Sequence, residues 1–439
     1  MLEGSLGLLG SIMANLSIFP AVMAIELPLY LLVLTGMVRH ALTASRPAAT
    51  AGNAPFRPSG LPGVSCIITC YSEGDAVIKT IDCLVQQDYA GSIEVIAVVD
   101  GADRNRETLA AARRSARLWA ASRRRRVKVI PKWQRGGRVS SLNTGLALAR
   151  GAIVMALDGD TSFDDDMVSR AVSRMQDPRV IALTGTLRVR NGSETLWTRL
   201  QALEYLIGLV GTRTGLSSFN VTNNVSGAFG VFRRDILQRL GGWECGTAED
   251  LDLTLRLQRH TGRRPGCIIA FEPGAIGHTD APASLRDLLM QRLRWDGDLF
   301  YIYVRKHWRA FSPRILGWRR LLATTWYGLL HQLVLPFVIA LYALWMTWHE
   351  GGMAVVLTLG LIYVLYLAIA AVMAAASILL ISERRARDCR LLPLLLVFPV
   401  YRGVMRLWSV VAILAEIVLT QHRDSSMAPW WVLRRSVYR

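Results

Sequence analysis

Two aspartates separated by one glycine, Asp158 and Asp160, end the stretch "AIVMALDGD". An Asp-Gly pair is common in hairpin turns, so a simple turn is one interpretation. Carboxylates at the end of an apolar run also suit a hard divalent cation, Mg²⁺ or Mn²⁺, which takes oxygen ligands and often shares them with substrate phosphates. The chain has no glycine–lysine loop of the Walker type, which argues against a P-loop nucleotidase.

Other polar side chains follow further apolar runs of the same kind. Tyr71 and Glu73 follow "VSCIIT", and Asp100 ends "IEVIAVVD". A third run, "RVKVIP", precedes the helix start "SLNTGLALAR", and "DAVIKTIDCLVQQ" has helical spacing. This alternation predicts a parallel sheet with helices on both faces. Ligands of such sheets bind beyond the carboxyl ends of the strands, so we expect these polar groups along one edge.

Long apolar segments flank this mixed region. They cover residues 6–38, 321–348, 353–381 and 391–420. The segments 321–348 and 353–381 exceed the ~20 residues that cross a bilayer and contain no Asp, Glu, Lys or Arg. Residues 1–25 hold no Lys or Arg, which argues against a cleaved signal peptide. The first segment is therefore predicted to be one kinked span or two short ones.

The last apolar segment is interrupted by Arg402 and Arg406. Charges inside a membrane are costly, so we expect a broken element that starts as an interfacial or re-entrant helix and leaves the tail in the cytoplasm. The loop "ERRARDCR", residues 383–390, is basic, whereas the loop "HEGG" has no Lys or Arg. The positive-inside rule then places the globular domain and the loop 383–390 in the cytoplasm.

Charge and cysteine content limit the possible partners. The net charge of +18 is explained by the positive-inside bias and by the basic run 123–126 facing water or lipid headgroups, and nucleic acid is not an expected partner. The six cysteines form no C-x-x-C pair. We expect them to be reduced and structural.

Seven short motifs occur in a fixed order over residues 64–310: "VSCIITCYSEG", "VVDGA", "GGRVSSLNTGL", "DGD", "VSGAFGVFRRDIL", "AEDLDLTLRL" and "QRLRW". Together with the flanking apolar segments, they resemble the membrane-embedded family 2 glycosyltransferases, which include cellulose, hyaluronan, chitin-oligosaccharide and poly-N-acetylglucosamine synthases. The resemblance implies an α/β fold, a Rossmann-like GT-A nucleotide-sugar domain inserted between transmembrane helices.

The expected organisation of the chain follows from this resemblance and the apolar segments. It comprises N-terminal transmembrane segments (1–42), a linker (43–63), the cytoplasmic GT-A domain (64–280), interfacial amphipathic helices with the Q-x-x-R-W motif (281–318), C-terminal transmembrane or re-entrant helices (319–420) and a cytoplasmic tail (421–439).

The resemblance also implies roles for individual residues. The expected donor-binding residues are Tyr71, Glu73, Asp100, Arg138 and Asp158; the metal ligands for Mg²⁺ or Mn²⁺ are Asp158 and Asp160; the catalytic residues are Asp250 as general base and Glu249 beside it; and the acceptor and diphosphate end has Gln291, Arg292, Arg294 and Trp295. Two simpler interpretations stay open. "EDLDLT" is also a normal helix start, and a lone histidine such as His278 is more often structural than a metal ligand.

The implied function is that of an inverting, processive synthase. It would polymerise a UDP-activated hexose, from UDP-glucose or UDP-N-acetylglucosamine, into a β-linked polysaccharide and pass it through its own transmembrane channel. Its partners would be the donor, the growing polysaccharide, the lipid bilayer of the plasma (inner) membrane and possible accessory subunits or further copies. One alternative is a non-processive transferase to a lipid acceptor. Another is a transporter or scaffold that binds nucleotide-sugar without turnover.

Overall fold

The computed structural model describes residues 2–44, 60–122, 124–245 and 247–420, with only the backbone for 2–21. Within these residues one eight-stranded sheet has the order β3-β2-β1-β4-β7-β6-β8-β5. Its strands are β1 (Val64–Cys70), β2 (Ile93–Asp100), β3 (Arg125–Lys132), β4 (Ile153–Asp158), β5 (Ser162–Phe163), β6 (Val180–Val189), β7 (Phe229–Arg233) and β8 (Ile268–Thr279).

The first four long strands run parallel, as their sequence pattern predicts. Thr69 of β1 is paired with Asp158 of β4, and Cys70 is paired with Val99 of β2. The polar residues that follow these strands therefore share one edge of the sheet. Beyond β4 the sheet is mixed, because β7 runs antiparallel to both β4 and β6.

Helices cover both faces of the sheet, because the central strands carry apolar side chains on both faces. One face packs against α2 (Ala76–Val85), α3 (Arg106–Leu118) and α5 (Met167–Met175). The other packs against α4 (Gly137–Leu148), α8 (Arg234–Arg239) and α9 (Glu249–Arg263). The two clusters lie on opposite faces of the sheet, as expected for an α/β domain.

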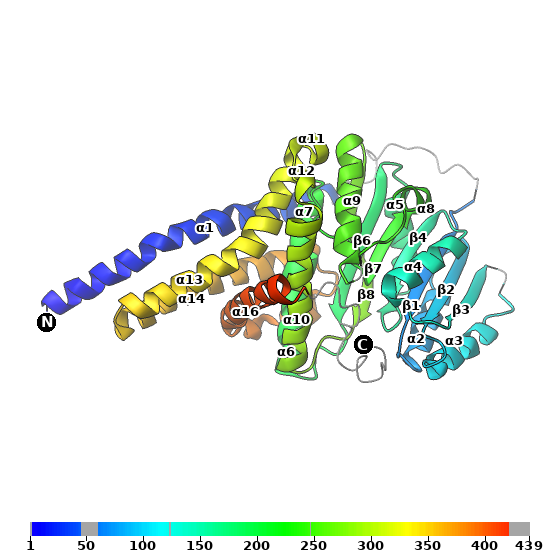
Figure 1. Cartoon of the computed structure of the whole chain (residues 1–439), viewed down its shortest axis with the longest axis horizontal. Helices are drawn as coiled ribbons and strands as arrows, with labels where there is room; N and C mark the ends of the chain where they lie inside the picture. The colour runs from blue at the N-terminus through cyan, green and yellow to red at the C-terminus, as the bar shows by residue number, and fades with distance from the viewer. Residues whose placement is uncertain (1, 45–59, 123, 246, 421–439) are drawn as a thin grey trace.

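A layer of helices lies between this domain and an elongated apolar arm (Figure 1). The layer contains a continuous helical rod, formed by α6 (Leu196–Glu204), the π-helical stretch η2 (Tyr205–Thr212) and α7 (Arg213–Ser218), together with α10 (Leu285–Phe300) and α16 (Phe398–Leu419). Short segments precede or follow these helices in the chain. They are η3 (Tyr301–Lys306), η4 (Trp308–Ala310) and α11 (Pro313–Leu316), which follow α10, and η7 (Leu392–Leu396), which precedes α16.

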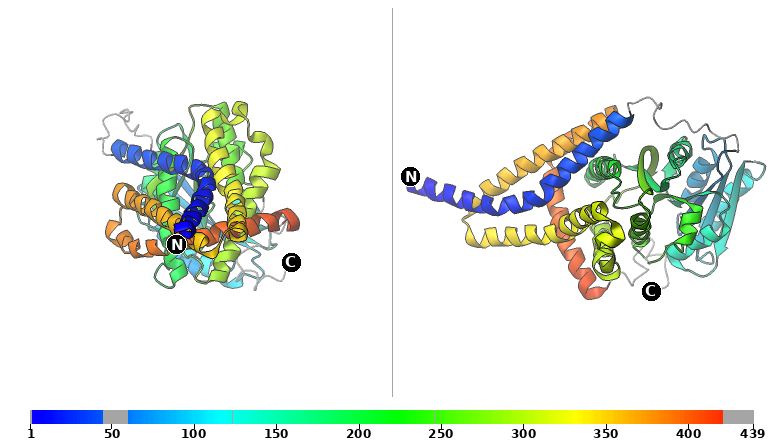
Figure 2. Two further views of the ribbon diagram at one scale, coloured as in Figure 1. Left: turned by 90° about the vertical axis from the view of Figure 1, so that its left-hand side faces the viewer. Right: turned by 90° about the horizontal axis from the view of Figure 1, so that it is seen from above.

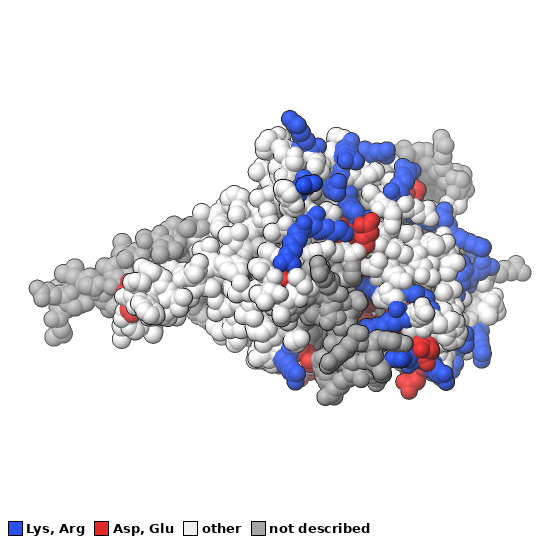
Figure 3. All heavy atoms as spheres, viewed as in Figure 1, with Lys and Arg blue, Asp and Glu red and all other residues white. Residues whose placement is uncertain are grey.

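The apolar arm holds three helices of the described chain that are long and apolar enough to cross a membrane: Val22–Thr43, Trp318–His349 and Gly352–Ile381. They belong to α1 (Leu2–Ala44), to α12 (Trp318–Ala323) with η5 (Thr324–Val334) and α13 (Leu335–His349), and to α14 (Gly352–Ala376) with η6 (Ser377–Ile381). Figure 2 shows α1 and α14 side by side along the arm. Charged side chains gather on the domain, whereas the described surface of the arm is almost free of them (Figure 3).

Several expectations can be compared with this arrangement. The N-terminal segment is one helix, α1, with one candidate span. The last apolar segment is broken between η7 and α16, and α16 is not among the candidate spans of the described chain. The six cysteines are unpaired. The tail 421–439, most of the linker (45–59) and Arg123 lie outside the described residues.

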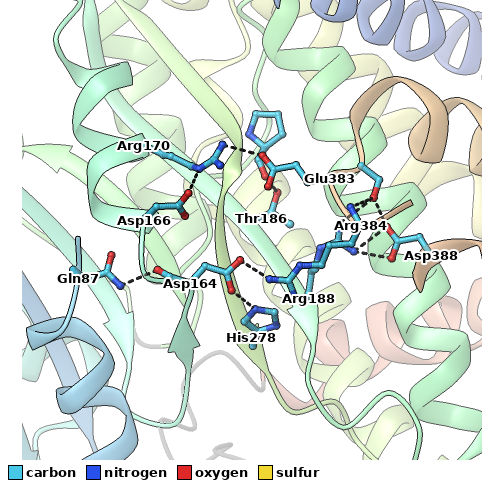
Figure 4. A network of polar contacts seen from close by, with 12 residues as sticks. Gln87, Asp164, Asp166, Arg170, Thr186, Arg188, His278, Glu383, Arg384 and Asp388 are labelled. Carbon is cyan, nitrogen blue, oxygen red and sulfur yellow. Dashed lines mark hydrogen bonds and ion pairs between the residues drawn. The ribbon is translucent and has the colours of Figure 1, made fainter. Parts of the chain in front are cut away.

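The basic loop 383–390, which carries α15 (Arg385–Cys389), docks on the far edge of the sheet (Figure 4). Arg188 Nη1 donates to Asp388 Oδ1 at 2.8 Å, and both side chains are largely buried. Arg384 Nη2 donates to Asp164 Oδ2 at 2.6 Å, four residues beyond Asp160. The loop after the last candidate span therefore lies at the same end of the molecule as the α/β domain.

Candidate active site

The edge formed by β1, β2 and β4 is organised around Asp100 at the end of β2. Its Oδ1 accepts from Lys132 Nζ and from the Gly136 amide, each at 2.8 Å, and its Oδ2 accepts from the Gly137 amide at 2.8 Å. Gly137 has a φ of +75°, which favours glycine there. These bonds fix the loop before α4 against the strand ends. Asp100 is therefore fully engaged in holding this loop.

Tyr71 lies beside that loop at the end of β1. The guanidinium of Arg135 lies over its ring, 4.4 Å from the ring centre. Such a flat, cation-backed aromatic ring can stack on a planar base. The structure thus brings Tyr71 and Asp100 together, as the sequence predicts.

The Asp-Gly-Asp segment continues directly from β4. Gly159 has no room for a side chain, because a Cβ there would lie 2.9 Å from the Thr69 carbonyl oxygen and 3.3 Å from the Glu73 carboxyl carbon. The glycine between the two aspartates therefore lets this segment touch the end of β1 and brings Glu73 close to Asp158 and Asp160. The turn interpretation and the ligand interpretation are thus compatible.

The three carboxyl groups at this point carry an excess of negative charge. Burial, together with the charges of Asp160 and Asp158, raises the pKa of Glu73 to about 7. Burial, together with the charge of Asp158, raises the pKa of Asp160 to about 6. Glu73 Oε2 is buried and has no hydrogen-bond partner within the described structure. An unsatisfied buried carboxylate oxygen beside two further acids is the environment that a divalent cation relieves.

Protein ligands alone do not complete a metal site here. Over the described residues, no three His, Cys, Asp or Glu side chains are arranged to hold a metal ion. Mg²⁺ is commonly bound through one or two carboxylates plus substrate phosphates, so Asp158 and Asp160 fit a metal that arrives with its ligand. His278 is hydrogen bonded through Nε2 to Asp164 at 2.8 Å, which favours a structural role.

Arg138, in the first turn of α4, joins this edge to the second half of the site. Its Nη1 contacts Asp158 Oδ1, and its Nε donates to Glu249 Oε1 at 2.5 Å. Its Nη2 donates to the Gly227 carbonyl oxygen at 2.7 Å. The residue was expected to bind the donor, and here it bridges the Asp-Gly-Asp segment and the start of α9.

Glu249 and Asp250 begin α9. Burial raises the pKa of Glu249 to about 7, although Arg138 opposes this shift. Asp250 Oδ2 accepts from Asn224 Nδ2 and from the Gly227 amide, each at 3.2 Å, and its Oδ1 accepts from the Leu251 amide at 2.7 Å. A Cβ on Gly227 would lie 3.0 Å from Glu249 Oε1, so a side chain there would push the Glu249 carboxylate slightly away.

The Q-x-x-R-W motif lies on α10 and divides between two surroundings. Gln291 Oε1 is buried without a partner in the described structure, and Trp295 is 36% exposed. Arg292 turns toward the helical layer, where its Nη2 donates to Glu204 Oε2 at 2.7 Å and its guanidinium lies 4.7 Å from the Trp295 ring centre. Burial raises the pKa of Asp298 to about 7. Arg294 lies close enough to oppose this shift. Arg292 is therefore paired with Glu204 of the helical layer, and no ion pair joins it to Asp158 or Asp160 in the described structure.

Sequence reasoning missed several members of the site. Lys132 was not selected, although it follows the third apolar run as directly as Asp100 follows the second. Asn224 precedes "VSGAFG" by a single position and holds Asp250. Arg213 of α7 is buried and close enough to Asp250 for that acid to act on its pKa. It had no signal in the sequence, because nothing local shows that a lone arginine in a helix is buried.

A family model described as glycosyltransferase like family 2 matches residues 62–297. A poly-beta-1,6-N-acetyl-D-glucosamine synthase of Staphylococcus epidermidis is 26% identical over 273 residues, 60% of this chain and 62% of that protein. An N-acetylglucosaminyltransferase of Mesorhizobium japonicum is 30% identical over 257 residues, 55% of this chain and 58% of that protein. The chain thus spans about three fifths of the length of these relatives.

Among solved structures, a mannosyltransferase from Pyrobaculum calidifontis in complex with GDP-Man and Mn²⁺ is similar to this chain with a TM-score of 0.57. The identity is 21%, and the match covers 91% of this chain and 99% of that one. This likeness confirms the predicted Rossmann-like GT-A fold combined with apolar helices. The family match includes both the sheet edge formed by β1, β2 and β4 and the start of α9. The chain belongs to the glycosyltransferase-like family 2.

Proposed function

We propose that this protein is a membrane-bound inverting glycosyltransferase that moves a hexose from UDP to a sugar hydroxyl and so builds a β-linked polysaccharide. We call the sheet edge formed by the ends of β1, β2 and β4 the donor edge. One observation carries the proposal: a single guanidinium, Arg138, contacts both Asp158 at the donor edge and Glu249 beside Asp250. Arg138 thus joins the groups suited to a nucleotide diphosphate to the residue next to the candidate base, Asp250.

On the donor side, Tyr71 would stack on the base and Asp100 would keep the loop 135–138 against it. Asp158 and Asp160 would hold Mg²⁺ or Mn²⁺, with Glu73 as a further acid nearby. When bound, such a metal neutralises the charge that develops on the leaving diphosphate. N-acetylglucosamine is the favoured sugar because the relatives are named for it, and glucose is the second candidate.

On the acceptor side, Asp250 would accept the proton of the attacking hydroxyl. Asn224 and the Gly227 amide hold its Oδ2, which fixes the carboxylate without adding a positive charge. A fixed, ionised carboxylate within hydrogen-bond reach is what a general base requires. Because a single displacement involves no enzyme nucleophile, an α-linked donor would give a β-linked product.

Arg138 would change its partners when the donor binds. Its guanidinium neutralises Asp158 and Glu249 in the absence of the donor. Phosphate oxygens can replace one or both carboxylates, because a guanidinium forms the same kind of N–H···O bonds with phosphate as with carboxylate. Glu249 would then keep Arg138 directed at the phosphate, so its role is to position rather than to remove a proton.

The acceptor would be a carbohydrate that lies between α9 and α10. Two buried amide oxygens have no partner in the described structure, Gln291 Oε1 and Asn223 Oδ1, and each can accept from a sugar hydroxyl. The exposed face of Trp295 can stack on a sugar ring. The polymer would then leave between the membrane helices, with the domain and the loop 383–390 on the cytoplasmic side of the plasma membrane.

A donor panel tests the proposal. The full-length protein in nanodiscs receives UDP-N-acetylglucosamine, UDP-glucose, UDP-glucuronate or GDP-mannose with Mg²⁺ or Mn²⁺, and nucleotide release and product size are measured. UDP release with a high-molecular-weight product is the expected result. UDP release with a small lipid-linked product would replace the polymerase by a lipid transferase. Donor binding without any release would favour a transporter or scaffold.

A further inference from the structure

The two aspartates of the Asp-Gly-Asp segment are held in different ways. Asp158 ends β4, and its carboxylate contacts Arg138. The Asp160 carboxylate instead receives a long hydrogen bond of 3.5 Å from the hydroxyl of the neighbouring Thr161. Because a bond of this length is weak, the position of Asp160 depends mainly on the backbone that carries it. That backbone continues into a network of ion pairs at the far edge of the sheet (Figure 4).

The stretch between Asp160 and Asp164 is short and closely packed. It contains β5, whose two residues pair with β8 in antiparallel orientation. Phe163 of β5 is buried, and its ring meets that of Phe229 edge to face with 5.3 Å between the ring centres. The Asp164 amide donates to the Ile276 carbonyl oxygen at 3.1 Å. A packed stretch of this length moves as a unit, so the contacts that hold Asp164 also fix Asp160.

Two partners share the Asp164 carboxylate. Its Oδ1 is hydrogen bonded to His278 Nε2 at 2.8 Å, and its Oδ2 accepts from Arg384 Nη2 at 2.6 Å. Burial acts to raise the pKa of Asp164, but the bond to His278 and the charge of Arg384 hold this pKa below its ordinary value. His278 belongs to β8 of the same sheet, whereas Arg384 belongs to the loop that follows the candidate span Gly352–Ile381. Arg384 therefore connects the segment to the membrane part of the chain.

The loop that carries Arg384 is itself fixed on the domain. Asp388 accepts from Arg188 Nη1 of β6 at 2.8 Å to one carboxylate oxygen and 3.0 Å to the other. Ser382, the first residue after the span, donates through its hydroxyl to the same carboxylate. The Ser382 hydroxyl oxygen also accepts from the Arg384 amide at 3.0 Å. These bonds hold the guanidinium of Arg384 at a defined place relative to both the end of the span and the sheet.

The ion pairs of this network differ in what their loss would do. The side chains of Arg188 and Asp388 are 14% and 5% exposed, and breaking a buried pair leaves an uncompensated charge that destabilises the fold. The side chains of Arg384 and Asp164 are 32% and 27% exposed, and an ion pair open to water contributes little to folding. Loss of the Arg384–Asp164 pair should therefore leave the protein folded while it loosens the segment that carries Asp160.

We propose that Arg384 is a positioning residue: its ion pair with Asp164 fixes the segment 160–164 and so holds Asp160 where a divalent cation would bind. Partners that hold a metal ligand in place govern metal affinity nearly as strongly as the ligand itself. The consequence for the metal rests on the proposed function, whereas the fixing of the segment does not. The loop after the last candidate span is thereby a working part of the donor site.

Hydrogen exchange tests the fixing of the segment on the full-length protein in nanodiscs, without nucleotide or metal. Peptides that cover residues 158–166 are followed by mass spectrometry. In Arg384→Gln we expect their amides to exchange at least about threefold faster, because local opening becomes easier. Arg384→Lys keeps the charge and should recover part of the protection. Arg387→Gln is the matched control, since Arg387 is an exposed arginine on the same loop, and it should exchange like the unchanged protein.

Equal exchange of these peptides in Arg384→Gln and Arg387→Gln would overturn the proposal. Faster exchange throughout the α/β domain of Arg384→Gln would overturn it as well, because the pair would then serve the stability of the whole domain.

Metal-dependent UDP binding tests the consequence for Asp160. UDP is bound at rising Mn²⁺ concentration, and the concentration that gives half of the maximal binding is compared between variants. We expect it to rise at least about threefold in Arg384→Gln and to stay unchanged in Arg387→Gln. An unaltered Mn²⁺ requirement in Arg384→Gln would contradict the positioning of Asp160. Absence of UDP binding by the unchanged protein would refute the proposed function, and the exchange data would still decide whether Arg384 holds the segment.

Discussion

The donor edge of the sheet and the helical layer behind Asp250 differ in the sign of their unsatisfied charge. At the donor edge, Glu73, Asp158 and Asp160 lie close together, Arg138 contacts Asp158, and a Glu73 oxygen is left without a partner in the described structure. In the helical layer, Arg213 and Arg292 have the unpartnered atoms. The first region favours a cation, whereas the second has spare hydrogen-bond donors. Asp250 begins α9 beside Glu249, whose contact with Arg138 joins it to the donor edge, where a donor held through its metal would meet the carbohydrate acceptor.

The largest effect on kcat should come from changing Asp250, the candidate general base. Asp250→Asn removes the proton acceptor but keeps an oxygen for Asn224 and Gly227, so we expect kcat to fall about 1000-fold with donor binding unchanged. UDP release and UDP binding measure the two quantities. Asp235→Asn, an exposed acid on α8, should leave both unaltered. A donor-binding loss equal to the kcat loss would assign Asp250 to the donor side instead.

Arg138 is the contact between the donor edge and α9, and its loss should be next in size. Arg138→Gln leaves Asp158 and Glu249 without a counter-charge, and we expect kcat to fall about 100-fold, because one preorganised donor to the phosphates is lost. Arg138→Lys should recover part of the activity, since lysine keeps the charge but not the three-way fork. Equal activity of the Gln and Lys variants would show that the charge is not used.

Gly159 allows the Asp-Gly-Asp segment to pack closely against the end of β1. Gly159→Ala places a Cβ 2.9 Å from the Thr69 carbonyl oxygen, so the Asp-Gly-Asp segment must shift away from β1. We expect KM for the donor to rise about tenfold, as small misplacements of binding groups do. Gly266→Ala is the control, because a Cβ there meets nothing within 4 Å. An unaltered KM in Gly159→Ala would remove this segment from the donor site.

The smallest predicted effect is the dependence of kcat/KM on pH. Burial raises the pKa of Glu249 to about 7, so below pH 7 the group is increasingly protonated and its ion pair with Arg138 weakens. We therefore expect kcat/KM to rise severalfold between pH 6 and pH 8. In Glu249→Gln this rise should become smaller, and the part that remains should come from Glu73 and Asp160, whose pKa values of about 7 and about 6 lie in the same range. A rise of the same size in the variant would contradict the role given to Glu249.

The donor edge was predictable from sequence because its residues follow apolar strands directly and parallel strands end on one side. Tyr71, Asp100 and Asp158 needed no more than that rule. The strands β6 to β8 were not predicted; β8 reads "IIAFEPGAIGHT", in which Pro273 and the glycines obscure the alternation. The partners of Arg138 and Arg384 lie up to 220 residues away in the chain, so no local pattern reveals them. Arg292 shows the same limit, since its helix position is clear from sequence but its partner Glu204 is not.

The most direct test of the account is whether nucleotide binding at the donor edge depends on a divalent cation. UDP is titrated into the full-length protein with Mn²⁺ and with a chelator, and the titrations are repeated on Asp160→Asn. The account predicts that UDP affinity falls at least about tenfold with the chelator, and that in Asp160→Asn the affinity is low and insensitive to Mn²⁺. UDP binding of equal strength with and without Mn²⁺ would contradict the assignment of these carboxylates.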